Sequence, residues 1–133
     1  MKKHIFLVDN DDSTIKMFSS ALNEFGGLYK CTCAGSARHA VSMLQYLTPD
    51  FIITSNRQPE VNGLQLLEEI KKVSRLAAIP FYLYEEGTNP ELHKKVVALG
   101  GNGCIEKPQS IPWLRQVLQR LFKQLTLPKR MFR

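Results

Sequence analysis

The chain has 133 residues, 44% of them hydrophobic and 23% charged, a composition typical of one ordinary globular domain. No apolar stretch approaches the ~20 residues that span a bilayer, and Met1-Lys2-Lys3 leads straight into a short apolar run, so we expect a cytoplasmic protein without membrane contact. Cys31, Cys33 and Cys104 are odd in number and lack a C-x-x-C spacing. They are therefore expected to be free, buried or half-buried thiols rather than a disulfide framework or zinc knuckle.

The net charge of +6 is distributed unevenly along the chain. Up to Glu106, 11 Lys/Arg are balanced by 12 Asp/Glu, whereas the residues after it include seven basic and no acidic side chains. Such asymmetry suggests an acidic partner, either a protein surface or nucleic acid. We expect Arg115, Arg120 and Lys123 to form a cationic strip facing that partner; the alternative is a solvated basic helix.

Apolar residues alternate along the chain between continuous runs, typical of strands buried on both faces, and stripes with helical spacing. In chain order they predict a strand at 5–8, a helix over 15–25, a strand at 28–33, a helix over 37–47, a strand at 51–53, a helix over 64–73, a strand at 81–84, a helix opened by Asn89-Pro90-Glu91, a strand at 103–106 and a helix over 114–125. Asp11 or Asp12 is expected to cap the first helix and Ser110 the last.

Five strands alternating with five helices predict a doubly wound α/β fold, a three-layer sandwich around a parallel sheet. Right-handed crossovers favour the strand order 2-1-3-4-5, and ligands of such sheets bind at the carboxyl ends of the strands. One domain is expected over residues 1–125, followed by a basic tail at 126–133.

Several short motifs fall at the ends of these strands and resemble those of a response-regulator receiver domain (CheY-like superfamily). They are Val8-Asp9 after the first strand, Pro49-Asp50 before the third, Pro59 with Gly63 after it, Ile79-Pro80 before the fourth and Lys107-Pro108 after the fifth. The resemblance covers about residues 4–125. It implies the flavodoxin-like/CheY-like sandwich, a role in two-component phosphorelay signal transduction, and no enzymatic activity of the domain's own.

The resemblance also implies which residues form the site. Ser55 takes the position of the aspartate that accepts a phosphoryl group, and a hydroxyl there cannot form an acyl phosphate. Asp9 and Asn10 take the positions of two acids that hold Mg²⁺, an ion that prefers carboxylates and water. Arg57 takes the position whose carbonyl completes the metal site; its side chain either replaces the metal's charge or points to solvent. We therefore expect a vestigial acidic pocket without a bound cofactor.

Two switch positions depart from the family pattern as well. Glu85 stands where a hydroxyl residue contacts the phosphoryl group, and Cys104 where the family has a rotating aromatic residue. Lys107 is retained, and the resemblance implies a cis peptide bond between it and Pro108. Lys107 requires an anion, and both Glu85 and Asp9 are available at neighbouring strand ends. We predict a Glu85–Lys107 ion pair that holds the pocket in one state; the alternative is that Glu85 and Glu86 are exposed loop acids.

These observations favour a stand-alone pseudo-receiver that acts as a phosphorylation-independent protein-interaction module. Its expected partner is a histidine kinase or another regulator, bound through the face of the fourth helix, fifth strand and fifth helix. One alternative is a working receiver in which Asp9 holds Mg²⁺ and Ser55 or another residue accepts the phosphoryl group. Another is a nucleic-acid binder acting through the basic C-terminus, which is disfavoured because no helix-turn-helix or other reader motif follows the domain.

Overall fold

The computed structural model describes residues 3–57, 60–87 and 89–126. The strands are β1 (Lys3–Val8), β2 (Tyr29–Ala34), β3 (Phe51–Thr54), β4 (Phe81–Glu85) and β5 (Gly103–Glu106). The helices are α1 (Asp12–Asn23), α2 (Ala37–Met43), α3 (Gly63–Lys71), α4 (Pro90–Ala98) and α5 (Ile111–Thr126). Apart from Thr126, the predicted tail lies outside the described residues.

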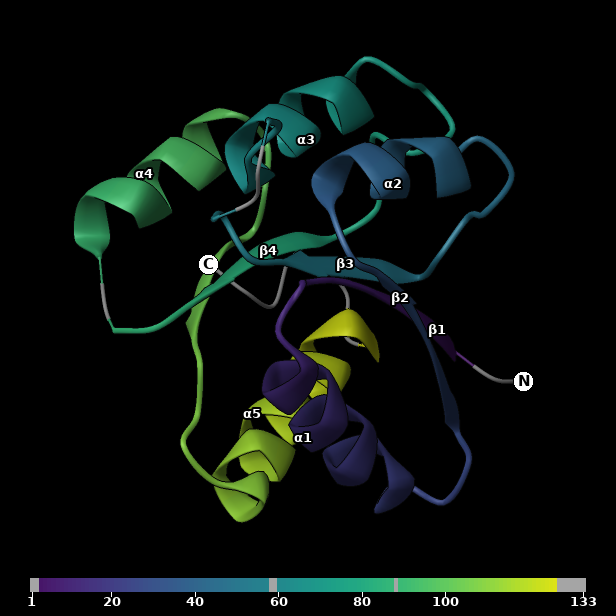
Figure 1. Ribbon diagram of the computed structural model, residues 1–133, viewed down its shortest axis with the longest axis vertical. Helices are drawn as coiled ribbons and strands as arrows, with labels where there is room; N and C mark the ends of the chain where they lie inside the picture. Colours follow the sequence, from purple (N-terminus) through teal and green to yellow (C-terminus); the bar gives the residue numbers. More distant parts are fainter. Residues whose placement is uncertain (1–2, 58–59, 88, 127–133) are drawn as a thin grey trace.

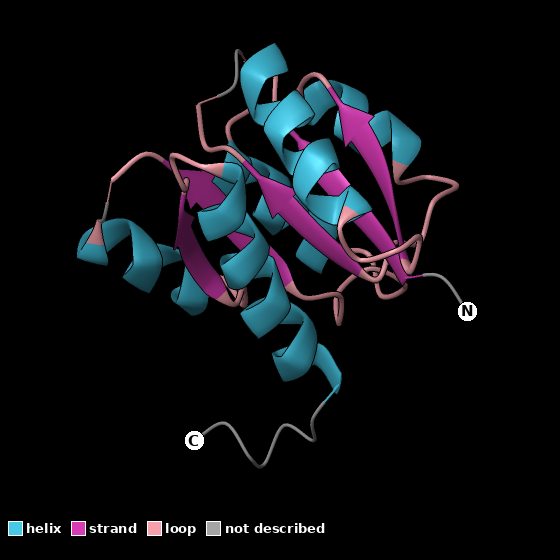
Figure 2. Ribbon diagram, turned by 90° about the horizontal axis from the view of Figure 1, so that it is seen from below, coloured by secondary structure: helices cyan, strands magenta, loops and turns pink. Residues whose placement is uncertain are grey.

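All five strands are parallel and follow the order β2-β1-β3-β4-β5, which confirms the predicted topology. Helices α1 and α5 cover one face of the sheet, and α2, α3 and α4 cover the other (Figure 1). Seen from below, the strand arrows run between these two helical layers and point to one edge (Figure 2). That edge carries the carboxyl ends of the strands, where a doubly wound sheet places its site.

The helix starts depend on polar side chains that accept hydrogen bonds from otherwise unpaired backbone N–H groups. The Asp11 side chain accepts from the Ser13 N–H at 3.3 Å, Asn89 from Leu92 at 3.1 Å, and Ser110 from Trp113 at 3.3 Å. These three caps were predicted from the sequence. The reciprocal capping box between Asn62 and Gln65 at the start of α3 was not.

The core consists of two apolar layers, one on each face of the sheet. β1 and β3 contribute to both layers, because their alternate side chains point to opposite faces and those of residues 5–8 and 51–54 are buried. The helices predicted over 15–25, 37–47 and 64–73 end earlier than predicted, at Asn23, Met43 and Lys71. Val73, the last apolar residue of the third stripe, lies beyond α3 and is 42% exposed. Val41, in the second stripe, lies at the margin of the core with 37% exposure.

Phe122 on α5 was missed by the sequence reading. It is buried, and its ring stacks on Tyr29 with a centroid distance of 3.7 Å.

In the described part of the chain, no helix is both long and apolar enough to cross a bilayer.

Candidate functional site at the carboxyl edge of the sheet

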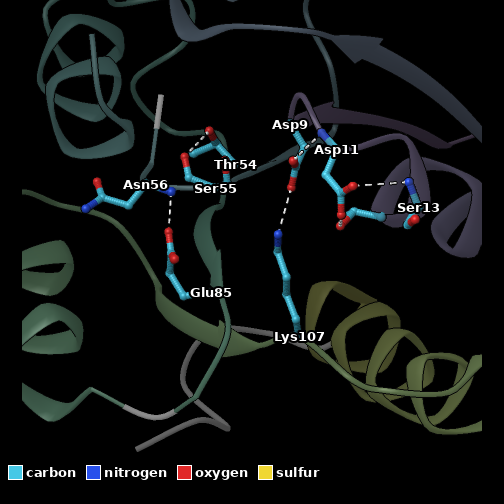
Figure 3. Close-up of polar contacts among 9 residues, drawn as sticks. Asp9, Asp11, Ser13, Thr54, Ser55, Asn56, Glu85 and Lys107 are labelled. Atoms are coloured by element: carbon cyan, nitrogen blue, oxygen red, sulfur yellow. Dashed lines mark hydrogen bonds and ion pairs between the residues drawn. The ribbon is translucent and has the colours of Figure 1, made fainter. Parts of the chain in front are cut away.

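Four of the predicted site residues converge at the carboxyl edge of the sheet (Figure 3). Asp9 follows β1 and Ser55 follows β3, and these two strands are neighbours with Val8 paired to Thr54. Glu85 is the last residue of β4, and Lys107 directly follows β5. The parallel arrangement therefore brings together side chains that lie far apart in the sequence.

Asp9 and Lys107 form an ion pair, with Nζ of Lys107 3.1 Å from Oδ2 of Asp9. The pair is largely withdrawn from solvent, since the side chains are 2% exposed for Asp9 and 17% for Lys107. The other carboxylate oxygen of Asp9 accepts a hydrogen bond from the Asp11 N–H at 3.0 Å. Both oxygens of Asp9 are thus engaged, one by a cation and one by the backbone.

Tyr84 borders this ion pair from β4. The Lys107 ammonium lies 5.6 Å from the centroid of the Tyr84 ring, within the range of a cation–π contact. Burial, and secondarily the charge of Asp9, raises the pKa of the Tyr84 phenol. Tyr84 therefore stays protonated at neutral pH and adds no negative charge to the site.

Ser55 is buried, with only 5% of its surface exposed. Its backbone N–H donates to the Val8 carbonyl at 3.0 Å, and its own carbonyl accepts from the Thr54 hydroxyl at 3.0 Å. The turn that follows packs tightly against it, because a Cβ at Gly63 would lie 2.8 Å from the Ser55 carbonyl oxygen and 2.7 Å from a Leu83 methyl group. Glycine at position 63 is therefore a packing requirement of this site.

Asn56 connects Ser55 to the next helix and was missed by the sequence reading. Its side-chain oxygen accepts from the Leu64 N–H at 3.1 Å, and its carbonyl accepts from the Gly63 N–H at 3.2 Å. These bonds fix the start of α3 on the end of β3. The sequence signal that could have identified it is an Asn just past a buried strand, two residues after the end of β3, where amide side chains commonly hydrogen-bond to nearby backbone.

The prediction of an ion pair between the Glu85 carboxylate and the Lys107 ammonium was wrong; these residues are joined through their backbones, with the Lys107 N–H donating to the Glu85 carbonyl at 2.7 Å. Its carboxylate accepts a hydrogen bond from the backbone N–H of Asn56, directly after Ser55 (Figure 3). Lys107 instead contacts Asp9, because a carboxylate as buried as that of Asp9 would cost far more to leave unpaired than the half-buried Glu85. The alternative of an exposed loop acid describes Glu86, which is exposed, and not Glu85.

Asn10, Arg57 and Cys104 stand apart from this arrangement. Asn10 and Arg57 are exposed, and within the described ranges Arg57 makes no ion pair. Cys104 is half-buried on the α4 side, where its N–H donates to Nδ1 of His93 at 3.2 Å. Its thiol pKa is raised by burial and by the charge of Glu85.

The predicted cis bond before Pro108 was also wrong, because no cis peptide occurs among the described residues. The two isomers of such a bond differ by only about 0.5–1 kcal/mol, so the local packing decides between them.

The residues at this edge fit Mg²⁺ poorly. Mg²⁺ requires near-octahedral coordination by oxygen atoms, supplied largely by carboxylates and water. Here the Asp9 carboxylate is already paired with Lys107, and the neighbouring Asp11 carboxylate accepts hydrogen bonds from the Ser13 N–H and the Thr14 hydroxyl. Over the described part of the chain, no group of three or more His, Cys, Asp or Glu side chains is placed to hold a metal ion.

The predicted cationic strip lies on the outer side of α5. Arg115, Arg120 and Lys123 are all exposed, as expected. Arg115 is partly neutralised, because it pairs at 3.0 Å with Glu24, the C-cap residue of α1. Beside the strip, Trp113 is 62% exposed and borders a groove. The groove is lined by Ile105, Glu106, Lys107, Pro108, Gln109, Trp113 and Val117.

Comparison with known proteins identifies the family. Residues 5–119 match the response regulator receiver domain, so the chain belongs to that family, the signalling module of two-component pathways. The chemotaxis response regulator CheY4 of Vibrio cholerae superposes with a TM-score of 0.80 at 26% identity, over 91% of this chain and 99% of that one. The phosphorylated cyanobacterial phytochrome response regulator RcpA superposes with a TM-score of 0.83 at 22% identity, over 94% of each chain, which indicates a shared fold.

Curated relatives are longer proteins. Regulatory protein AtoC of Escherichia coli (strain K12) is 25% identical over 125 residues, 94% of this chain and 26% of that protein. Protein RcaC of Microchaete diplosiphon is 22% identical over 118 residues, 88% of this chain and 18% of that protein. The chain thus spans roughly a fifth to a quarter of the length of these two relatives.

Proposed function

We propose that this receiver domain works as a phosphorylation-independent protein-interaction module in a two-component pathway. The observation that carries the proposal is the buried Ser55 at the position of the phosphoacceptor. A serine hydroxyl is a weak nucleophile unless a base activates it. The nearest candidate, Asp9, already binds Lys107 and the Asp11 N–H and so is a poor base.

Two internal carboxylates would take over the role of the absent phosphoryl group. Asp9 satisfies the Lys107 ammonium, and Glu85 satisfies the Asn56 N–H next to Ser55. The cation and the backbone donor at this edge thus each have an anionic partner inside the chain. An incoming phosphoryl group would have to displace one of these two carboxylates, Asp9 or Glu85, and would be repelled by the remaining one. The pocket would consequently hold one state whether or not a kinase is active.

The proposed partner surface is formed by α4, β5 and α5. It combines the exposed Trp113 and the groove beside Pro108 with the cations of α5. Exposed aromatic residues flanked by charge are common anchors of protein interfaces. Receiver domains interact with histidine kinases and other regulators, and we propose a protein of that kind with an acidic surface.

The proposal is tested by incubating the chain with Mg²⁺ and acetyl phosphate, and separately with a phosphorylated histidine kinase, and then measuring the intact mass. No gain of a phosphoryl group is expected. A metal-dependent gain that disappears in Ser55→Ala would instead support a working phosphoacceptor and would overturn the proposal. The matched control is Ser55→Asp combined with Asn10→Asp, which restores the carboxylates and should recover some Mg²⁺ binding.

A further inference from the structure

Cys31 and Cys33 form a close pair of thiols on the edge strand β2. They are two residues apart, so both side chains point to the same face of the sheet, and their Sγ atoms lie 3.9 Å apart. Both are free and half-buried, packed at the margin of the layer under α1 and α5. A small solute can therefore reach them, and two sulfur atoms are available to it at once.

The two thiols differ in acidity. The hydrogen bond from Cys31 lowers the pKa of Cys33 to about 7, although burial and the charge of Asp9 oppose this. The same hydrogen bond and burial raise the pKa of Cys31. Cys33 is thus the more acidic thiol of the pair and the one that supplies the thiolate, the reactive form of cysteine, while Cys31 remains a thiol beside it.

We propose that Cys31 and Cys33 are a redox-active dithiol that hydroperoxides convert into an intrastrand disulfide. The Cα atoms of residues two apart in a strand are about 6.6 Å apart. Bridged cysteines span Cα distances of about 4.4–6.8 Å, so the strand can accept the bridge near the upper limit of that range. The sulfur atoms must approach one another by about 1.9 Å to reach the bonding distance. A bridge at the limit of the range is readily reduced, which suits a reversible modification.

The reaction proceeds in two balanced steps. The Cys33 thiolate attacks one oxygen of the hydroperoxide, so that an S–O bond forms, the O–O bond breaks, and the departing alkoxide or hydroxide takes a proton. Cys33 is then a sulfenic acid. The Cys31 sulfur attacks the sulfur of Cys33, so that the S–S bond forms, the S–O bond breaks, and hydroxide leaves with the Cys31 proton as water. Two electrons pass from the two sulfur atoms to the peroxide.

The dithiol adjoins the functional edge of the sheet. Cys33 pairs with Leu7 of β1, and the carbonyl of the next residue, Ala34, accepts the backbone N–H of Asp9 at 3.0 Å. Closure of the bridge shortens this part of β2. Formation of the Cys31–Cys33 disulfide is therefore expected to shift the backbone amide NMR signal of Asp9. Modification of Cys104, which lies on β5, is not expected to shift it.

The test is treatment of the full chain with stoichiometric hydrogen peroxide, followed by intact mass and peptide mapping. We expect a loss of two hydrogen atoms, a mapped Cys31–Cys33 link, and full reversal by dithiothreitol. At neutral pH, Cys33 should react roughly tenfold or more faster than Cys104, because a much larger fraction of it is thiolate. In Cys31→Ser, oxidation should stop at a sulfenic acid on Cys33 that a dimedone reagent traps.

Cys104→Ser is the matched control, since it removes the remote thiol and should leave the bridge and its rate unchanged. The rate comparison between Cys33 and Cys104 uses the unaltered chain, so it remains valid if a variant fails to fold. The proposal would be overturned by equal reactivity of the three thiols, by oxidation to sulfinic acid without a bridge, or by disulfides only between separate chains.

Discussion

Replacing Lys107 by Met would test how strongly the ion pair with Asp9 holds the site together. The substitution keeps much of the aliphatic stem but leaves a carboxylate whose side chain is 2% exposed without a cation. Breaking a buried ion pair in this way typically costs about 3–5 kcal/mol. Lys107 is itself 17% exposed, and Asp9 keeps its bond from the Asp11 N–H, so we expect a loss in the free energy of unfolding near about 3 kcal/mol, at the lower end of that range.

The assay is urea unfolding at neutral pH, with the free energy taken from the midpoint and slope. Lys72→Met is the matched control, because Lys72 pairs with Glu69 at a similar distance of 3.2 Å but is 70% exposed. That surface pair is expected to contribute only about 0–1 kcal/mol. Adding Asp9→Asn to Lys107→Met should recover much of the loss, since it removes the unpaired charge and retains an oxygen for the Asp11 N–H. A stabilising role of the buried ion pair would be ruled out if Lys107→Met cost no more than Lys72→Met, or if the double variant were less stable than Lys107→Met alone.

Three further predictions concern other parts of the chain. Gly63→Ala should destabilise the fold by about 1–3 kcal/mol in urea unfolding, because its Cβ meets the Ser55 carbonyl, whereas Gly35→Ala, with no atom near its Cβ, should have little effect. The pKa of His4 is lowered from 6.5, chiefly by burial and then by Lys30, so below about pH 6.5 the unfolded state binds more protons than the folded state and the free energy of unfolding should fall. The fall should be smaller in His4→Gln, and equal stability profiles of the two proteins against pH would contradict this. Charge reversal at Arg120 and Lys123 should slow association with an acidic protein partner and flatten its salt dependence, with little loss of fold stability. An unaltered on-rate would show that these residues are only a solvated surface.

The fold could be predicted from the sequence because its signals are local and mutually consistent. Continuous apolar runs marked strands buried on both faces, and the caps at Asp11, Asn89 and Ser110 marked three helix starts. The helix ends were less accurate. Val73 continues the apolar spacing of α3, but the helix ends at Lys71, before it. The spacing of apolar residues alone does not show where the backbone stops being helical.

The members of the site were predictable, but their pairing was not. The sheet topology brings Asp9, Ser55, Glu85 and Lys107 to one edge, and this follows from strand order alone. Which carboxylate binds Lys107 depends on burial, which differs between Asp9 and Glu85 in a way the sequence does not encode locally. The role of Asn56 was missed for a related reason, since its contacts are with backbone groups rather than with residues of complementary charge.

A pocket that holds one state without phosphorylation should not respond to a phosphodonor. The backbone amide NMR spectrum of the chain, recorded before and after addition of Mg²⁺ and acetyl phosphate, measures this response directly. We expect the amide signals of Ser55, Asn56, Glu85 and Lys107 to stay in place, because their donors and charges are already satisfied within the chain. Saturable shifts of these signals that require both Mg²⁺ and the phosphodonor would contradict it.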